Sequence, residues 1–244
     1  MRRLISAVLL AFSTTALAAD PTVDELLAGT DDLTRGNSSQ AVMVMEVKTA
    51  RYERTVKMEA FSQGTENSLI RILEPAKEAG ISTLKVGDNI WNYLPKVDRT
   101  MKVPAGMMSG AWMGSHISND DLVRESRLSE DFDYQITERP AGDAGQWVIE
   151  LTPKPDAPVV WGKIVATIGA DKLPRTIAYH DEDGELVRTM TYSNIEEIGG
   201  RTIPTRFTVI PADKPEEYTA ISYEELAFDV EIPESTFSLQ ALRR

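Results

Sequence analysis

The sequence of 244 residues contains no cysteine, only two histidines, and no apolar run long enough to cross a bilayer. The lack of cysteine excludes disulfide frameworks, thiolate metal sites and cysteine nucleophiles together. His116 and His180 lie far apart and form no ligand pattern, so the sequence predicts neither a metal site nor a bound cofactor. Each is interpreted as an ordinary surface or loop histidine. The fold must therefore be stabilised by a hydrophobic core.

Signatures of known catalytic sites are also missing. Residues 106–110 come nearest to the G-x-S-x-G pattern of a serine hydrolase, but Ser109 is one place out of position. No glycine-rich phosphate loop is present, and carboxylates are too abundant for one catalytic pair to stand out. The sequence therefore predicts that the protein is not an enzyme. A hydrolase acting on lipid or glycan is the remaining catalytic alternative.

Positive charge is scarce relative to negative charge. The chain has 26 basic and 38 acidic residues, which gives a formal net charge of −12. Such a surface repels nucleic acid and anionic lipid head groups, so both are poor partners.

The N-terminus has the three parts of a secretory signal peptide. Arg2 and Arg3 form the positively charged region, residues 4–12 form a short apolar run, and residues 16–18 supply small side chains at the cleavage site. We expect residues 1–18 to be removed and the exported chain to begin at Ala19. Because the chain has no cysteine, the lipid-modified cysteine of a bacterial lipoprotein is excluded.

Hydrophobic periodicity predicts a short helix followed by many strands. Residues 22–33 place Val23, Leu26 and Leu27 on one face of a helix. Thereafter apolar residues alternate with period two in short segments separated by turn sequences, and residues 183–184 and 199–200 are typical of two-residue hairpin turns. The predicted strands are 41–49, 53–62, 68–73, 81–86, 90–94, 99–103, 132–138, 146–152, 160–168, 174–180, 186–193, 201–209 and 218–228. This spacing predicts a single domain over residues 19–244, built on an antiparallel meander.

A glycine- and methionine-rich insert over residues 104–127 interrupts the strands. Ser118 is a helix cap there, with Asp120 and Asp121 in the first helical turn. The insert combines glycines, which disfavour a rigid helix, with large and flexible apolar side chains. That combination indicates a mobile flap over an apolar cavity, although packing in the core also explains methionines such as Met43 and Met58.

Two segments of the chain resemble a known family. These segments are I-W-N-Y-L-P at 90–95 with D-R-T-M at 98–101, and M-G-S-H-I-S-N-D-D-L at 113–122. They resemble the outer-membrane lipoprotein-sorting branch of the periplasmic lipoprotein-carrier (LolA-like) superfamily. The resemblance covers essentially the whole exported chain, and it departs from the branch at His116, where an acidic residue is common. It implies a basic residue that holds a lid shut, but no counterpart is evident.

The resemblance implies a mainly β (α+β) fold: an unclosed antiparallel β-barrel of about eleven strands, with short helices as a lid over an apolar cavity. It implies a monomeric periplasmic carrier of acylated lipoproteins or lipids, with a chaperone-like role in outer-membrane biogenesis and an inner-membrane transporter as a possible partner. The candidate cavity residues are Met43, Met45, Met58, Leu84, Trp91, Tyr93 and Met101, and the candidate lid residues are Met107, Met108, Trp112, Met113, Ile117 and Leu122. A periplasmic sensor, or an accessory subunit of an inner-membrane export complex, is the alternative use of the same fold.

Overall fold

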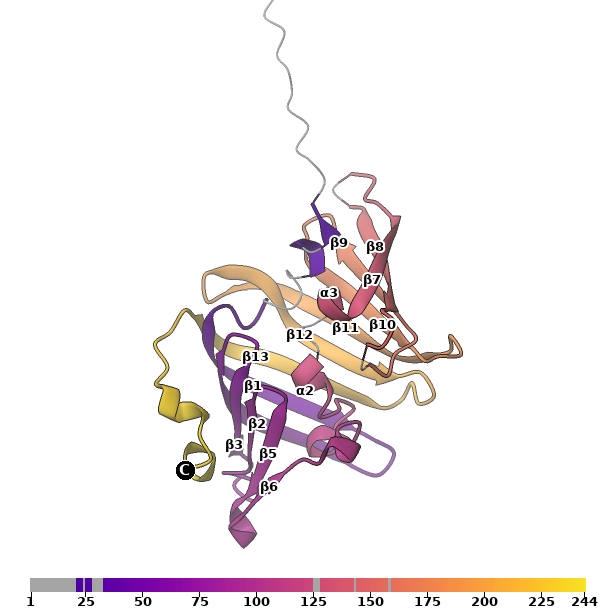
Figure 1. Ribbon diagram of the computed structural model, residues 1–244. Coiled ribbons are helices and arrows are strands. Elements are labelled where there is room, and N and C mark those ends of the chain that lie inside the picture. The colour runs from indigo at the N-terminus through magenta and orange to yellow at the C-terminus, as the bar shows by residue number, and fades with distance from the viewer. Residues whose placement is uncertain (1–20, 24, 28–32, 125–127, 143, 158) are drawn as a thin grey trace, which may run out of the picture.

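The computed structural model describes residues 21–23, 25–27, 33–124, 128–142, 144–157 and 159–244. Within them one antiparallel sheet of thirteen strands dominates (Figure 1). Its first six strands are β1 (Ser38–Lys48), β2 (Glu53–Gln63), β3 (Asn67–Glu74), β4 (Ser82–Val86), β5 (Asn89–Leu94) and β6 (Arg99–Lys102). The other seven are β7 (Phe132–Glu138), β8 (Gln146–Pro153), β9 (Lys163–Gly169), β10 (Pro174–His180), β11 (Leu186–Ile198), β12 (Arg201–Pro211) and β13 (Tyr218–Phe228).

The sheet consists of two meanders, β1 to β6 and β7 to β13, which are joined where the first strand of the chain pairs with the last. The order is β6-β5-β4-β3-β2-β1-β13-β12-β11-β10-β9-β8-β7, so β1 pairs with β13 in the middle of the sheet. The sheet is strongly curled, and β6 and β7 remain unpaired with each other at its two edges (Figure 1). The mainly β, unclosed antiparallel architecture is therefore confirmed. The described sheet has thirteen strands rather than about eleven, and these correspond to the thirteen segments that alternate in the sequence.

Alternation along the strands decides which side chains face the inside of the curl. On β1, Ala41, Met43 and Met45 are buried and point to the same face. Met43 lies directly opposite Met58 of β2 in the register of the ladder. These side chains belong to one large buried cluster that continues through β13 to β8, where Ile149 is fully buried. The period-two pattern thus places the core on the concave face.

Short helical elements are few in the described residues. They are α2 (Asp121–Arg124), α3 (Leu128–Asp131) and the 3-10 turns η1 (Pro95–Val97), η2 (Ala105–Met107), η3 (Trp112–Gly114), η5 (Glu234–Phe237) and η6 (Ala241–Arg243). The helices α2 and α3 lie inside the curl of the sheet (Figure 1). No helix in the described part of the chain is long and apolar enough to cross a membrane.

The predicted N-terminal helix is described only in part. The hydroxyl of Thr22 accepts a hydrogen bond from the Glu25 amide at 3.2 Å, and the Glu25 carboxylate accepts one from the Thr22 amide at 3.0 Å. This reciprocal pair is a capping box, which fixes the first turn of a helix. Leu26 and Leu27 that follow are buried against the main core, as the periodicity predicts. The predicted signal peptide, residues 1–18, lies outside the described residues.

The two predicted hairpin turns have different outcomes. Gly199 and Gly200 alone connect β11 to β12, with φ of 59° and 78°, as a primed two-residue turn requires. Between β10 and β11 the connection is five residues long, 181–185. The Asp181 carboxylate there accepts hydrogen bonds from the amides of Asp183 and Glu185, which stabilises a wider loop than the sequence alone indicates.

A second, smaller apolar cluster lies on the opposite, convex face of the sheet. Leu69 and Leu84 from β3 and β4 are buried there beneath Leu242 of the C-terminal segment. That segment packs on β3, β4 and β5 on the outside of the curl. Arg71 of β3 donates a hydrogen bond to the carbonyl of Ala241 at 2.9 Å, which fixes the segment on the face. The convex face of the β3–β5 region is consequently covered by the C-terminal segment.

Candidate functional site

An apolar cavity of about 160 Å³ lies between the concave face and the residues that follow β6. We call residues 104–124 the cover segment, because four of its residues, Trp112, Ile117, Asp121 and Leu122, line the cavity from the side opposite the sheet. The lining residues are Leu33, Thr34, Arg35, Ser39, Ala41, Met43, Ala60, Phe61, Ser62, Ser68, Ile70, Trp112, Ile117, Asp121, Leu122, Leu128, Ile177, Met190, Tyr192, Pro204, Phe207, Ile221 and Tyr223. Most of them are aliphatic or aromatic, so the cavity favours an apolar occupant.

The cavity volume sets a limit on what fits without rearrangement. A dry protein cavity of about 150 Å³ accommodates a molecule the size of benzene. The 160 Å³ here is therefore enough for about six carbon atoms, and much less than a long acyl chain needs. A larger apolar ligand requires the cover segment to move away from the sheet.

One end of the cavity is polar. Ser39, Ser62 and Ser68 are direct neighbours across β1, β2 and β3, and all three line the cavity. The hydroxyls of Ser39 and Ser62 are buried and lie 2.7 Å apart, within hydrogen-bond distance. Thr34 and Arg35, from the turn that precedes β1, line the same cavity. A row of hydroxyls and a guanidinium thus adjoin an apolar interior.

Trp112 anchors the cover segment on the concave face. Its side chain is 2% exposed, and its indole Nε1–H donates a hydrogen bond to the Thr83 hydroxyl at 3.0 Å. Thr83 in turn donates to the side-chain oxygen of Asn92 at 2.7 Å. Both partners point inward from β4 and β5, so the ring covers the sheet with its one polar atom satisfied.

A partly buried ion pair fixes the far end of the cover segment. Arg188 of β11 donates two hydrogen bonds to the two carboxylate oxygens of Asp121, at 2.7 and 2.6 Å. The two side chains are only 9% and 12% exposed. The Arg188 guanidinium also lies over the rings of Trp161 and Tyr179, at 4.7 and 4.4 Å from their centroids. Ser118 caps α2 as predicted, because its hydroxyl accepts the Asp121 amide at 3.1 Å while the Asp121 carboxylate accepts the Ser118 amide at 2.7 Å.

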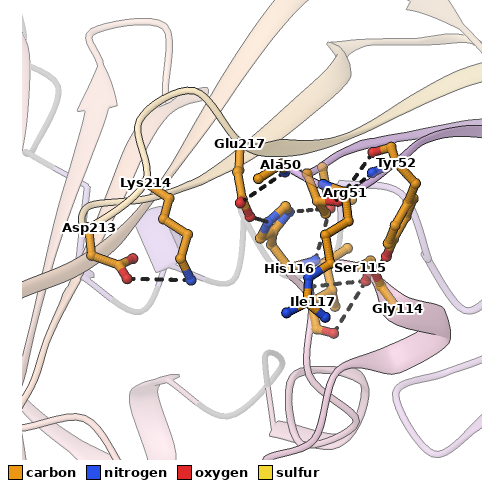
Figure 2. Close-up of polar contacts among 12 residues, drawn as sticks. Ala50, Arg51, Tyr52, Gly114, Ser115, His116, Ile117, Asp213, Lys214 and Glu217 are labelled. Carbon is orange, nitrogen blue, oxygen red and sulfur yellow. Dashed lines mark hydrogen bonds and ion pairs between the residues drawn. The ribbon is translucent and has the colours of Figure 1, made fainter.

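His116 connects the middle of the cover segment to β13 and to the β1–β2 hairpin. Its backbone amide and its Nδ1 both lie 2.9 Å from the Thr219 hydroxyl, and its Nε2 lies 3.2 Å from the Glu217 carboxylate. Figure 2 shows Glu217 between His116 and the backbone amide of Ala50, which donates to it at 3.1 Å. The Ala50 amide, and after it His116, lower the pKa of Glu217 below its ordinary value.

Two further side chains from the β1–β2 region bind backbone carbonyls of the cover segment. The Tyr52 hydroxyl donates to the carbonyl of Gly114, and Arg54 donates to the carbonyl of Met113 at 2.5 Å (Figure 2 shows the Tyr52 contact). Gly114 has a φ of 71°, and a Cβ there would lie 3.0 Å from the Tyr52 hydroxyl. Glycine is therefore required at this close approach.

The predicted cavity residues separate onto two faces. Met43 lines the cavity, whereas Met45 and Met58 are fully buried in the core beneath it. Met101, on edge strand β6, is half-buried and does not line the cavity. The placement of the other three was wrong: Leu84, Trp91 and Tyr93 belong to the cluster on the convex face, and they point away from the cavity. Adjacent positions on a strand face opposite sides, so Thr83 and Asn92 take the inward positions instead.

The predicted lid residues also divide. Trp112, Ile117 and Leu122 line the cavity, and Met113 packs against the main core. Met107 and Met108 do not line it, and Met107 is 62% exposed. Both lie in the turn around η2, which is closed by hydrogen bonds from their amides to the carbonyls of Pro104 and Ala105.

Several residues at this site escape sequence reasoning. Asp121 and Arg188 are 67 positions apart, and no local pattern links them. His116 is partly buried and hydrogen-bonded rather than an ordinary surface histidine, and His180 lies within strand β10. The row of Ser39, Ser62 and Ser68, called the serine row below, could have been recognised in the sequence, because each serine occupies an inward position in the alternation of its strand. In the described residues no group of three or more histidine, aspartate or glutamate side chains could hold a metal ion.

The sequence was compared with known protein families and with curated proteins. A family model described as “-like: Uncharacterized protein” matches residues 64–244. The chain belongs to that family. No curated protein matches the sequence.

Solved structures with the same fold are more informative. A domain from Vibrio parahaemolyticus described as an outer membrane lipoprotein-sorting protein is 20% identical, with a TM-score of 0.74 over 90% of this chain and 98% of that one. A LolA superfamily protein from Nitrosomonas europaea is 23% identical, with a TM-score of 0.74 over 91% and 100% of the two chains. A DUF1329 family protein from Desulfovibrio piger is 23% identical, with a TM-score of 0.76 over 92% and 100%. The chain therefore has the fold of the LolA superfamily, as the resemblance implies.

Proposed function

We propose that this chain is a non-enzymatic periplasmic carrier that binds acyl chains of lipoproteins or lipids in its concave cavity and moves them across the envelope. The observation that carries the proposal is the apolar cavity beneath the cover segment. The names of two similarly folded proteins, which refer to lipoprotein sorting and to the LolA superfamily, support the same class of cargo. The proposal also includes two predictions from the sequence, namely that residues 1–18 are a signal peptide and that residues 19–244 form a single domain.

A carrier of acyl chains must offer an apolar surface that replaces the membrane interior. Burial of each methylene group is worth about 0.8 kcal/mol, so an acylated molecule leaves a membrane slowly unless another apolar surface replaces the lipid. The main core cluster and the cavity lining offer such a surface on the inside of the curl. The cover segment is attached by the buried apolar side chains of Trp112 and Ile117 and by polar contacts at His116 and Asp121, and the polar contacts can exchange with water when it opens.

The experiment is a native mass spectrum of the gently purified chain, followed by titration with a fluorescent fatty acid. The matched variants are Ala60→Phe, which fills the cavity from the centre of the concave face, and Ala212→Phe, which adds the same ring at an exposed loop position. We expect Ala60→Phe to weaken binding at least tenfold and Ala212→Phe to leave it unchanged. Thermal unfolding of both variants checks that the added ring has not disrupted the fold, because overpacking costs about 1–3 kcal/mol.

Two results would contradict the proposal. One is a chain that carries no lipid and takes up no fatty acid. The other is equal binding by the wild type and Ala60→Phe, which would place the ligand elsewhere. A dry cavity combined with a stable protein partner found by crosslinking would instead favour the sensor or accessory-subunit role.

A further inference from the structure

The cavity is apolar at its centre and cationic at one end, and this asymmetry bears on the chemistry of its ligand. The basic residue in the lining is Arg35, which is half-buried in the turn before β1. The acidic residue in the lining, Asp121, is already paired with Arg188. An incoming anion therefore meets a guanidinium at one end of the cavity and a neutralised carboxylate elsewhere.

A second guanidinium lies beside the same turn. Gly36 has a φ of 57°, and a Cβ built on it would lie 3.1 Å from a guanidinium nitrogen of Arg201. Arg201 stacks on the ring of Phe228 at 3.8 Å and is only loosely paired with Asp229, at 3.8 Å. Two guanidinium groups thus lie near residues 35–36, that of Arg201 paired with Asp229 and that of Arg35 belonging to the cavity lining.

The serine row supplies hydrogen-bond donors next to this charge. The close contact between the Ser39 and Ser62 hydroxyls uses one of their two protons, so the other proton can be donated to a ligand oxygen. Ser68 continues the row, and Lys85 follows it on β4, with its ammonium donating to the Thr65 carbonyl. Three hydroxyls and nearby positive charge on one side of an apolar cavity match an anionic oxygen head group on an alkyl chain.

We propose that the ligand of this cavity is a single-chain anionic amphiphile, whose carboxylate or phosphate head lies at Arg35 and the Ser39–Ser62–Ser68 row, and whose chain lies under the cover segment. This inference rests on the proposed carrier function and adds the head-group chemistry to it. The net negative charge of the chain opposes docking on an anionic membrane surface. It opposes one enclosed anion much less, because exposed charges farther away than a Debye length of about 8 Å are largely screened.

The test measures the affinity of dodecanoate, dodecyl phosphate, dodecanol and dodecylamine by displacement of a fluorescent fatty acid. Hydrogen bonds to charged groups are worth about 1.5–3 kcal/mol, and the half-exposed position of Arg35 reduces that value. We therefore expect the anions to bind about tenfold more tightly than the alcohol and the amine to bind most weakly. The ratio of dodecanoate to dodecyl phosphate identifies which head group the site prefers.

The variants are Arg35→Gln, Arg35→Lys and, as a matched control, Arg99→Gln, which removes one exposed positive charge from β6. We expect Arg35→Gln to abolish the preference for anions while leaving the affinity for dodecanol unchanged, and Arg35→Lys to retain most of it. Arg99→Gln keeps the full preference. Raising the salt concentration from 20 to 500 mM reduces the preference in the wild type but not in Arg35→Gln.

The possible failures are distinguishable. Equal binding of dodecanol and dodecanoate by the wild type, or equal weakening of both by Arg35→Gln, overturns the head-group inference and leaves the carrier function standing. A failure of all four compounds to bind overturns the carrier function as well.

Discussion

Loss of the carboxylate charge at Asp121 should release the cover segment. In Asp121→Asn, the Arg188 guanidinium stays 9% exposed but loses its counter-charge and one of its two strong hydrogen bonds. Removal of one partner from a buried ion pair costs about 3–5 kcal/mol. Arg188 retains the faces of Trp161 and Tyr179, so we expect the lower end of that range, about 3 kcal/mol.

The effect should be local to the cover segment. A difference of about 3 kcal/mol corresponds to an increase of about 100-fold in the population of the open form. The assay is hydrogen exchange followed by mass spectrometry. The useful reporters are the amides of Trp112, Ser115 and Asn119, because each is hydrogen-bonded within the cover segment. We expect their exchange to accelerate by about two orders of magnitude, while amides in the middle of β12 change little.

A control and a double variant complete the experiment. Asp171→Asn removes an exposed ion pair with Arg175, which is worth at most about 1 kcal/mol, and should not alter exchange in the cover segment. Combining Asp121→Leu with Arg188→Met replaces the pair by apolar side chains and should recover much of the protection. Unchanged exchange in Asp121→Asn would refute the reasoning. So would uniform acceleration over the whole sheet, because the pair would then stabilise the fold rather than the closed cover.

The remaining predictions concern the loss of stability at acid pH and the stability cost of substitutions in the core. The pKa of Glu217 is lowered in the folded chain, so its contribution to stability is present above its unfolded pKa of about 4.3 and is lost as the pH falls through the lower folded value. Thermal unfolding between pH 7 and pH 3 should show a smaller acid-induced loss of stability in Glu217→Gln than in the wild type, and identical profiles would contradict this. Met45→Ala removes a fully buried side chain and should cost about 3 kcal/mol in urea unfolding, whereas Met107→Ala, at a 62% exposed position, should stay within about 0.5 kcal/mol. A loss below 1 kcal/mol for Met45→Ala would mean that the core relaxes around the change.

Period-two alternation predicted most of the sheet because its long strands have one apolar and one polar face. On β1 and β2 the inward positions, such as Met43 and Met58, follow from the pattern alone. The same reasoning failed on β4 and β5, where Leu84 and Trp91 are on the convex face. The C-terminal segment around Leu242 covers that face. The sequences of β4 and β5 contain nothing that predicts a contact with a segment so distant in the chain.

The cavity wall could be predicted only where a residue was both large and inward-facing. Alternation identified Met43, and the glycine- and methionine-rich insert identified Trp112, but the polar end depends on the register of three strands and on a turn. Serines in a strand are ordinarily assigned to solvent, and Arg35 resembles any loop arginine until the fold places it at the cavity. Long-range pairs such as Asp121 with Arg188 arise from the curl of the sheet, which the sequence pattern does not determine.

The pairing of β1 with β13 has a consequence for how the chain folds. Eleven of the twelve pairings in the described sheet join consecutive strands, and these can form by local hairpin closure. The β1–β13 ladder instead joins residues at least 170 positions apart, such as Lys48 and Tyr218. The entropic cost of closing such a loop is about 4.5 kcal/mol before any contact is made. The two meanders should therefore assemble separately and dock last along β1 and β13. Until they dock, both strands expose unpaired edges, and during that interval the chain is most prone to aggregation.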